Sequence, residues 1–262
     1  MVAGQTVNAG AICVVTAGGP HPWIIINALK QTFPNLKVVV EEPEGRLAFL
    51  RRRARRLGWV AVLGQFATMM VIRAGKLVLA GRIRRIIASD GLMTSPSPDQ
   101  QMVKLGSVNS DAFLSILDDI KPAAILLVGC RMMVAETLAR ISCPVLNYHA
   151  GITPQYRGMN GGYWALATDD GGNFGSTVHL VAPGVDTGPV IAQVRCAPRD
   201  GDTIMTYAYT QAAASRQMCV DALILATTRP LVSNVQSEAT SRQWYHPSLW
   251  QYLRTGMSKG VW

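Results

Sequence analysis

Residues 145–158, VLNYHAGITPQYRG, end an apolar run on two polar side chains and then enter a loop. Alternate residues of a β-strand face the same side, so Asn147 and His149 are expected to project together. Gly151 and Pro154 follow almost at once, which indicates that the strand ends at about His149. The stretch therefore predicts a buried strand that carries an amide and an imidazole at its carboxyl end.

The segments before this strand predict a parallel sheet. Residues 10–19, GAICVVTAGG, form an apolar run that stops at two glycines, and a segment of helical length leads to a second apolar run at 36–42. Strand, glycine turn, helix and strand in this order are typical of a βαβ unit. An amphipathic helix at 110–122 precedes an uninterrupted apolar strand at 123–130, as expected when helices cover both faces. We expect an α/β fold: an open, mostly parallel, Rossmann-like twisted sheet with helices on both faces.

A second polar side chain of interest lies further along the chain. Asp186 lies between Gly184 and Gly188, in a loop that joins two apolar runs within residues 175–198. An isolated Asp in such a loop is usually a turn former. A carboxylate that can reach an imidazole, however, fixes the orientation of the ring and stabilises its protonated form. A long helix is expected to begin at Asp202 and to close this part of the chain.

Length and composition restrict the class of protein. The chain has 262 residues, 49% of them hydrophobic, which suits one large domain or a domain with a short appendage. A net charge of +9 favours anionic partners. Five cysteines without a CxxC pair indicate reduced thiols and a cytoplasmic location. Four scattered histidines give no metal-ligand spacing, and the first residues lack the basic segment of a signal peptide.

A basic run and an apolar segment adjoin each other in the first third of the chain. The run extends from Arg51 to Arg56, and the uncharged segment from Leu57 to Ile72 follows it. That segment is shorter than the ~20 residues of a usual membrane span. We expect a buried or half-buried helix, with peripheral membrane contact as the alternative. The arginine run favours a solvated helix face, with weak contact to anionic lipid as the second reading. No pattern of an RNA-binding module is present, so nucleic acid is not expected as a partner.

Four motifs taken together resemble a known family. They are Asn147-x-His149, the loop with Pro154, Tyr156, Arg157 and Gly158, the helix start GGYWAL, and the stretch GSTVHLVAPGVDTGPVI at 175–191. Together they are similar to the folate-dependent formyltransferases, which include the glycinamide ribonucleotide, methionyl-tRNA and amino-sugar enzymes. The resemblance is strong over residues 120–195 and only topological before them. The family usually has proline after the histidine, whereas this chain has Ala150.

The resemblance implies a reaction and roles for three residues. A primary amine would attack the formyl carbon of 10-formyltetrahydrofolate and give a tetrahedral intermediate. His149 would take the amine proton or carry the charge that develops, and Asn147 would donate a hydrogen bond to the oxyanion. Asp186 would hold His149 or an ordered water in place. No metal takes part.

The resemblance also implies binding residues around these three. The pterin would lie against the segment after the preceding strand and against the loop before Asp186, and mostly backbone groups would contact it. The residues concerned are Arg131, Met132, Met133, Val134, Val181 and Gly184. Tyr156, Arg157 and Gly158 would form a substrate loop. His179 and His246 are expected to be dispensable for the chemistry, with His179 helping to hold the folate loop.

The acceptor is approached by elimination. The tRNA enzyme normally carries a further β-barrel domain, and the glycinamide ribonucleotide enzyme normally has a Gly-Ser-Asn phosphate loop where residues 16–22 read TAGGPHP. An amino sugar linked to a nucleotide, for example GDP-perosamine, therefore becomes the expected acceptor. The alternatives are another amine, namely glycinamide ribonucleotide or methionyl-tRNA, or a non-catalytic folate-binding or scaffold protein. We expect a catalytic domain at 1–228 and an aromatic-rich extension at 229–262, packed on that domain or on the second chain of a homodimer.

Overall fold

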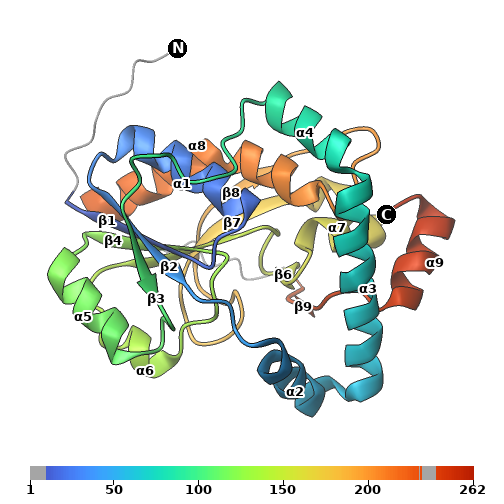
Figure 1. Ribbon diagram of the computed structural model, residues 1–262, viewed down its shortest axis with the longest axis horizontal. Helices are drawn as coiled ribbons and strands as arrows, with labels where there is room; N and C mark the ends of the chain where they lie inside the picture. The colour runs from blue at the N-terminus through green and yellow to red at the C-terminus, as the bar shows by residue number, and fades with distance from the viewer. Residues whose placement is uncertain (1–9, 230, 232–239) are drawn as a thin grey trace.

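The computed structural model describes residues 10–229, 231 and 240–262, except for the side chains of residues 46–49, 52 and 56 (Figure 1). Seven strands form one sheet in the order β3-β2-β1-β4-β5-β7-β8. The first five in this order pair in parallel, and β7 and β8 are antiparallel additions at one edge. The strands are β1 (Ile12–Thr16), β2 (Leu36–Glu41), β3 (Met102–Leu105), β4 (Ala124–Val128), β5 (Val145–His149), β7 (Gly175–Leu180) and β8 (Val190–Arg195). The expected α/β fold is confirmed.

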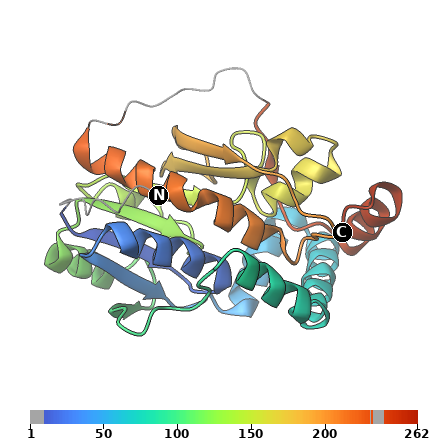
Figure 2. The ribbon, with the colours of Figure 1, turned by 90° about the horizontal axis from the view of Figure 1, so that it is seen from above.

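Helices cover the sheet on both faces. The helices α1 (Pro20–Thr32) and α8 (Tyr207–Thr228) pack together on one face, where Ile12 and Val14 of β1 meet them. The other face packs on α5 (Asp111–Ile120), with Cys13 and Val15 of β1 turned toward it and the short α6 (Ala135–Leu138) nearby. The two layers are visible on opposite sides of the strands (Figures 1 and 2). Alternate residues of β1 therefore supply two separate cores, which explains why the strand is apolar without interruption.

The long helix α8 begins five residues later than the sequence suggested. Its first residue is Tyr207, whereas the sequence pointed to Asp202. The carboxylate of Asp202 accepts hydrogen bonds from the Arg199 amide at 3.0 Å and from the hydroxyls of Thr206 and Thr210, each at 2.9 Å. Asp202 therefore ties a turn that precedes the helix, because its two oxygens are used both upstream and downstream of it.

A third core joins the end of the chain to the loop after β5. The two-residue strands β6 (Arg157–Gly158) and β9 (Gln243–Trp244) pair in parallel, and α7 (Gly161–Ala167), the 3₁₀ turn η1 (Gly171–Asn173) and α9 (Leu249–Lys259) surround them. The indole of Trp244 stacks on Trp164 with ring centroids 4.5 Å apart and donates to the Gln155 carbonyl at 2.9 Å. Residues 243–259 thus pack on the rest of the chain. The division into a domain at 1–228 and an extension at 229–262 remains a prediction. The stretch 232–239 of that extension lies outside the described residues.

Three helices form the connection from β2 to β3. They are α2 (Arg46–Leu57), α3 (Trp59–Val78) and α4 (Ala80–Ser89), with α3 along one edge of the molecule and the other two at its ends (Figure 1). Of the two expectations for residues 57–72, full burial is wrong and half-burial is confirmed, because nine of these 16 residues are buried or partly buried. Only Val62, Gln65 and Thr68 of this helix are buried, because it packs along one narrow side. Among the described residues, α3 is the one helix whose length and hydropathy would allow it to cross a membrane.

We expect Trp244→Ala to lower the free energy of unfolding by about 3–5 kcal/mol, the usual cost of emptying a buried aromatic site. The substitution removes both the stacked ring and the hydrogen bond to Gln155. Urea denaturation measures the effect. Trp250→Ala is the matched control, because that ring is 79% exposed on α9, and its effect should stay within about 0.5 kcal/mol. Equal losses in the two variants would show that residues near 244 do not stabilise this core.

Candidate active site

Three polar side chains meet at the junction of β5 and β7. Asn147 and His149 lie at the carboxyl end of β5, as the alternation of the strand predicted, and Tyr148 between them is buried in the core. The antiparallel pairing of β5 with β7 sets His179 directly opposite Asn147. The edge where parallel strands end is the usual ligand site of an open α/β sheet. The amide and the two imidazoles therefore lie where such sheets bind ligands.

Asp186 joins this cluster from the loop between β7 and β8. Its backbone has a φ of 49°, in the left-handed region, which a short polar residue tolerates better than most. One carboxylate oxygen accepts a hydrogen bond from Asn147 Nδ2 at 3.1 Å, and the other accepts from the Gly158 amide at 2.9 Å. His149 Nδ1 and His179 Nε2 each lie 3.4 Å from the carboxylate. The structure thus brings Asn147, His149 and Asp186 together.

The surroundings of Asp186 favour its ionised form. Burial by itself would raise the pKa of this carboxyl. The nearby charge of His149, the proximity of the His179 ring and the hydrogen bond from the Gly158 amide act in the opposite direction, and together they lower the pKa to about 2. Asp186 is therefore a carboxylate at every pH at which the protein would work.

The hydrogen bonds of His149 indicate which ring nitrogen can exchange a proton. Nε2 lies 2.7 Å from the carbonyl oxygen of Tyr156. A carbonyl can only accept, so Nε2 carries a hydrogen. Nδ1 faces Asp186 and is the nitrogen that can gain or lose a proton. A proton on Nδ1 would have the carboxylate of Asp186 beside it, and the Tyr156 carbonyl is the group that orients the ring through its other nitrogen.

His179 belongs to the same cluster, although the sequence suggested a role only in holding the loop. Its Nδ1 donates to the Leu180 carbonyl at 2.7 Å, so the neutral ring presents Nε2 as an acceptor to Asn147 Nδ2 at 3.1 Å. The two hydrogens of the Asn147 amide nitrogen are thus directed at His179 and Asp186. The signal that could have found His179 is its place opposite Asn147, which requires knowing that β7 runs antiparallel.

Tyr156, Arg157 and Gly158 hold two loops together. Arg157 donates to the Val185 carbonyl at 2.8 Å and to the Ser241 hydroxyl at 2.9 Å, and the Tyr156 hydroxyl donates to Asp170 at 2.7 Å. Gly158 has a φ of 93°, and a Cβ there would lie 2.3 Å from the Trp244 carbonyl oxygen. Only glycine therefore lets the loop approach β9 and point its amide at Asp186.

The residues expected around the pterin have different surroundings. Arg131 forms an ion pair with the buried Glu41 at 2.7 Å and donates to the Glu42 carbonyl at 2.6 Å. Met133 is buried in the core beneath the sheet, and Val181 packs against the same core. Met132 and Val134 are exposed, and Gly184 has a φ of 114° beside Thr187. The structure thus leaves Met132 and Val134 as apolar side chains that a ligand could cover.

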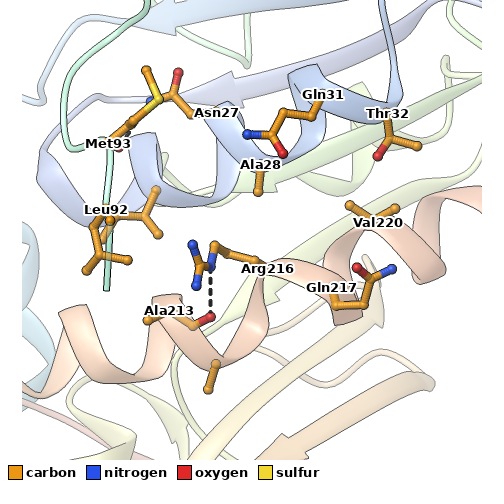
Figure 3. Close-up of a pocket in the computed structure, with 13 residues that line it drawn as sticks. Asn27, Ala28, Gln31, Thr32, Leu92, Met93, Ala213, Arg216, Gln217 and Val220 are labelled. Atoms are coloured by element: carbon orange, nitrogen blue, oxygen red, sulfur yellow. Dashed lines mark hydrogen bonds between the residues drawn. The ribbon is translucent and has the colours of Figure 1, made fainter. Parts of the chain in front are cut away.

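One cavity of the protein lies away from these residues. It has a volume of about 380 Å³ and lies between parts of α1 and α8 and the segment at residues 91–93. Asn27 and Gln31 of α1 lie across it from Arg216 and Gln217 of α8 (Figure 3). The Arg216 guanidinium donates to the Ala213 carbonyl of its own helix, and the Asn27 amide donates to Met93 and Ser95. The polar groups of Asn27 and Arg216 thus have partners within the protein. Within the described part of the chain, no three His, Cys, Asp or Glu residues are grouped as metal ligands.

Comparisons with known proteins identify the family of this chain. A family model described as "Formyl transferase" matches residues 74–223, more than half of the chain. The protein therefore belongs to the formyltransferase family. Methionyl-tRNA formyltransferase of Finegoldia magna is 32% identical over 87 residues, which cover 33% of this chain and 28% of that protein. The match thus spans less than a third of this curated relative's length.

Solved structures share the fold at low sequence identity. A phosphoribosylglycinamide formyltransferase from Anaplasma phagocytophilum superposes with a TM-score of 0.55 at 14% identity, covering 83% of this chain and 87% of that one. A sugar N-formyltransferase from a Shewanella species gives a TM-score of 0.52 at 11% identity, with coverage of 89% and 76%. The likeness shows the α/β formyltransferase fold, and it does not distinguish between acceptors.

We expect Asp186→Asn to remove a pH-dependent part of the stability. A carboxyl whose pKa falls from 3.8 to about 2 on folding stabilises the folded state above pH 4 by roughly 2 kcal/mol, and this contribution disappears as the pH falls toward 2. The variant should therefore be less stable than the native protein at pH 7 and equal to it near pH 2. Urea denaturation across this range measures the difference. Asp118→Asn, at an exposed position of α5, is the control, and a gap that does not change with pH would contradict the expectation.

Proposed function

We propose that this protein transfers the formyl group of 10-formyltetrahydrofolate to the primary amine of a nucleotide-linked amino sugar. One observation carries the transfer chemistry: Asn147, His149 and Asp186 form a connected cluster at the end of β5. Folate supplies the activated formyl group when it is bound. Membership of the formyltransferase family supports the reaction class, and the choice of the acceptor rests on the sequence and on the charges described below.

The residues present fit such a co-substrate. The exposed side chains of Met132 and Val134 offer an apolar surface to one face of a flat ring. The loop from Val181 to Gly184 offers backbone groups, and the left-handed Gly184 allows close approach. The side chain of Arg131 is held by Glu41, and its backbone N–H donates a hydrogen bond to the same carboxylate at 2.9 Å. We therefore propose that Arg131 positions its own backbone segment.

Each member of the cluster has a separate task in the proposed reaction. As the amine bonds to the formyl carbon, His149 Nδ1 would take the amine proton and pass it to the departing nitrogen when the old carbon–nitrogen bond breaks. Asp186 would balance the charge on His149. Asn147 would exchange its hydrogen bond to Asp186 for one to the carbonyl oxygen as negative charge develops there. We assign His179 to the positioning of Asn147, because it accepts from the second hydrogen of the same amide.

Three arginines near the substrate loop support an anionic acceptor. Arg157 lies in β6 itself, and Arg53 of α2 reaches Met159 at 3.6 Å and stacks over the Tyr245 ring. Arg242 lies over the Trp244 ring with its guanidinium carbon 3.8 Å from the ring centroid. All three adjoin the loop whose Gly158 amide contacts Asp186. A diphosphate near this loop would meet several cations, while its sugar amine reaches toward His149.

We expect His149→Ala to lower turnover at least ~100-fold, the usual scale for a lost general base. Asn147→Ala should lower kcat more than it raises KM, because an oxyanion donor acts mainly in the transition state. The production of tetrahydrofolate, followed by absorbance, measures both. His246→Gln is a control on a partly buried histidine outside the cluster and should lose less than about tenfold. Near-normal turnover of a folded His149→Ala protein would end the mechanistic assignment.

The acceptor is tested by competition at a fixed concentration of 10-formyltetrahydrofolate. We expect GDP, UDP or TDP to inhibit at millimolar concentration or below, and this inhibition should weaken as salt is raised, because charges are screened within ~8 Å at physiological ionic strength. Formylation of glycinamide ribonucleotide or methionyl-tRNA, without inhibition by any of the three nucleotides, would replace the sugar acceptor while leaving the reaction class intact. Folate binding without formyl transfer to any amine would favour a carrier or scaffold.

A further inference from the structure

Helix α3 has its apolar side turned outward. A helix of a soluble protein normally buries its apolar stripe and exposes its polar one. In α3 the buried positions include the polar residues Gln65 and Thr68, and Thr68 bonds back to the Gly64 carbonyl at 3.2 Å. Val60 is 88% exposed and Leu63 61% exposed. We call the outward set the α3 face; it consists of Trp59, Val60, Leu63, Phe66, Met70, Val71, Leu77 and Val78.

The inner side of α3 is fixed to the protein, so the outward direction of the α3 face is built into the fold. A Cβ on Gly64 would lie 3.3 Å from Ser248, and one on Gly75 would lie 2.4 Å from Met205, so the helix packs closely at both places. The helix α9 runs beside it at the same edge of the molecule (Figures 1 and 2). It adds the exposed side chains of Trp250 and Met257. Exposed apolar surface of this extent usually marks an interaction site.

Positive charge is concentrated in the same part of the chain. Residues 45–89 contain 11 Lys and Arg and no Asp or Glu, whereas the other 217 residues contain 14 basic and 16 acidic side chains. The whole surplus of the protein therefore belongs to α2, α3 and α4. Exposed cations on these helices are Arg51, Arg55, Arg73, Lys76, Arg84 and Arg85. At the corner of α2 and α3, a shallow hollow of about 340 Å³ is lined by Arg51, Ala54, Arg55 and Trp59.

We propose that α2, α3 and α4 bind the surface of an anionic lipid bilayer, with the α3 face in the interfacial layer and the flanking arginines on the headgroups. Apolar and aromatic side chains beside cations are the pattern of helices that lie on membranes. Arg73 and Lys76 lie in the last part of α3 and Gln65 and Thr68 are packed inward, so the helix lies on the bilayer and does not cross it.

Charge decides between this partner and two others. A second copy of the chain docking through the same face would bring two segments with 11 cations each into contact, and like charges there oppose association. Nucleic acid would satisfy the cations, but it would leave Val60, Leu63 and Leu77 against a polar backbone. An anionic bilayer satisfies both the charge and the apolar side chains.

The test is flotation of the full chain with vesicles of phosphatidylcholine, with or without roughly 30% phosphatidylserine. We expect the protein to float with the anionic vesicles and to stay in solution with the neutral ones. The double variant Val60→Glu/Leu63→Glu should lose binding at least about tenfold, because it places charge on the apolar layer. The double variant Arg51→Glu/Arg55→Glu should lose vesicle binding at least about tenfold, because it replaces attraction to the headgroups by repulsion and leaves the apolar side chains unchanged. All four positions are exposed, so folding is expected to survive, and circular dichroism verifies it.

Two matched variants test the place of binding. Met102→Glu/Val103→Glu adds two acidic side chains at exposed positions of β3, and Lys104→Glu/Lys121→Glu reverses two exposed lysines away from α2. Both should float with the anionic vesicles within about threefold of the native protein, a difference of under 1 kcal/mol. The proposal is overturned if the native chain stays in solution with both vesicle types, or if it floats equally with both. It is also overturned if the controls lose as much as the α3 variants, or if the native chain dimerises and Val60→Glu/Leu63→Glu makes it monomeric.

Discussion

The carboxylate of Asp186 is the hydrogen-bond acceptor on which the rest of the site depends. It receives the amide of Asn147 from β5 and the backbone N–H of Gly158 from the following loop, and it lies within 3.4 Å of two imidazoles. A buried carboxylate is costly unless it is paired and hydrogen-bonded. The four groups therefore have to be present together, and the left-handed backbone at Asp186 is held by the bonds that converge on it.

The groups that donate to the Asp186 carboxylate are held in place by distant parts of the chain. Gly158 directs its amide because β6 pairs with β9, and β9 is kept in place by the indole of Trp244 between Trp164 and Tyr156. A Cβ on Gly151 would lie 2.6 Å from both His149 Nε2 and the Tyr156 carbonyl, so the bond between these two groups requires glycine there as well. The glycines of the loop thus allow backbone groups to orient the ring of His149 and, together with the Asn147 side chain, the carboxylate of Asp186.

The local sequence pattern predicted the sheet and three of the four side chains of the cluster. The two-residue period of β5 placed Asn147 and His149 on one face, and the glycine-flanked loop marked Asp186. The place of His179 could not be found in this way, because the antiparallel direction of β7 is a property of the whole sheet. The apolar composition of α3 predicted a buried or half-buried helix, but composition does not say which side chains a half-buried helix turns outward. A two-residue strand such as β9 leaves no periodic signal at all.

The pairing of β6 with β9 has a consequence for the order in which the site is assembled. Asn147, His149 and Asp186 emerge from the ribosome well before Trp244, so the parallel sheet can form while the loop around Gly158 still lacks its neighbouring strand. Until β9 arrives, the Gly158 amide has no fixed direction and the charge on Asp186 lacks one of its donors. During synthesis, the surface proposed for folate and the loop proposed for the amine would therefore become competent at different times, with the loop last.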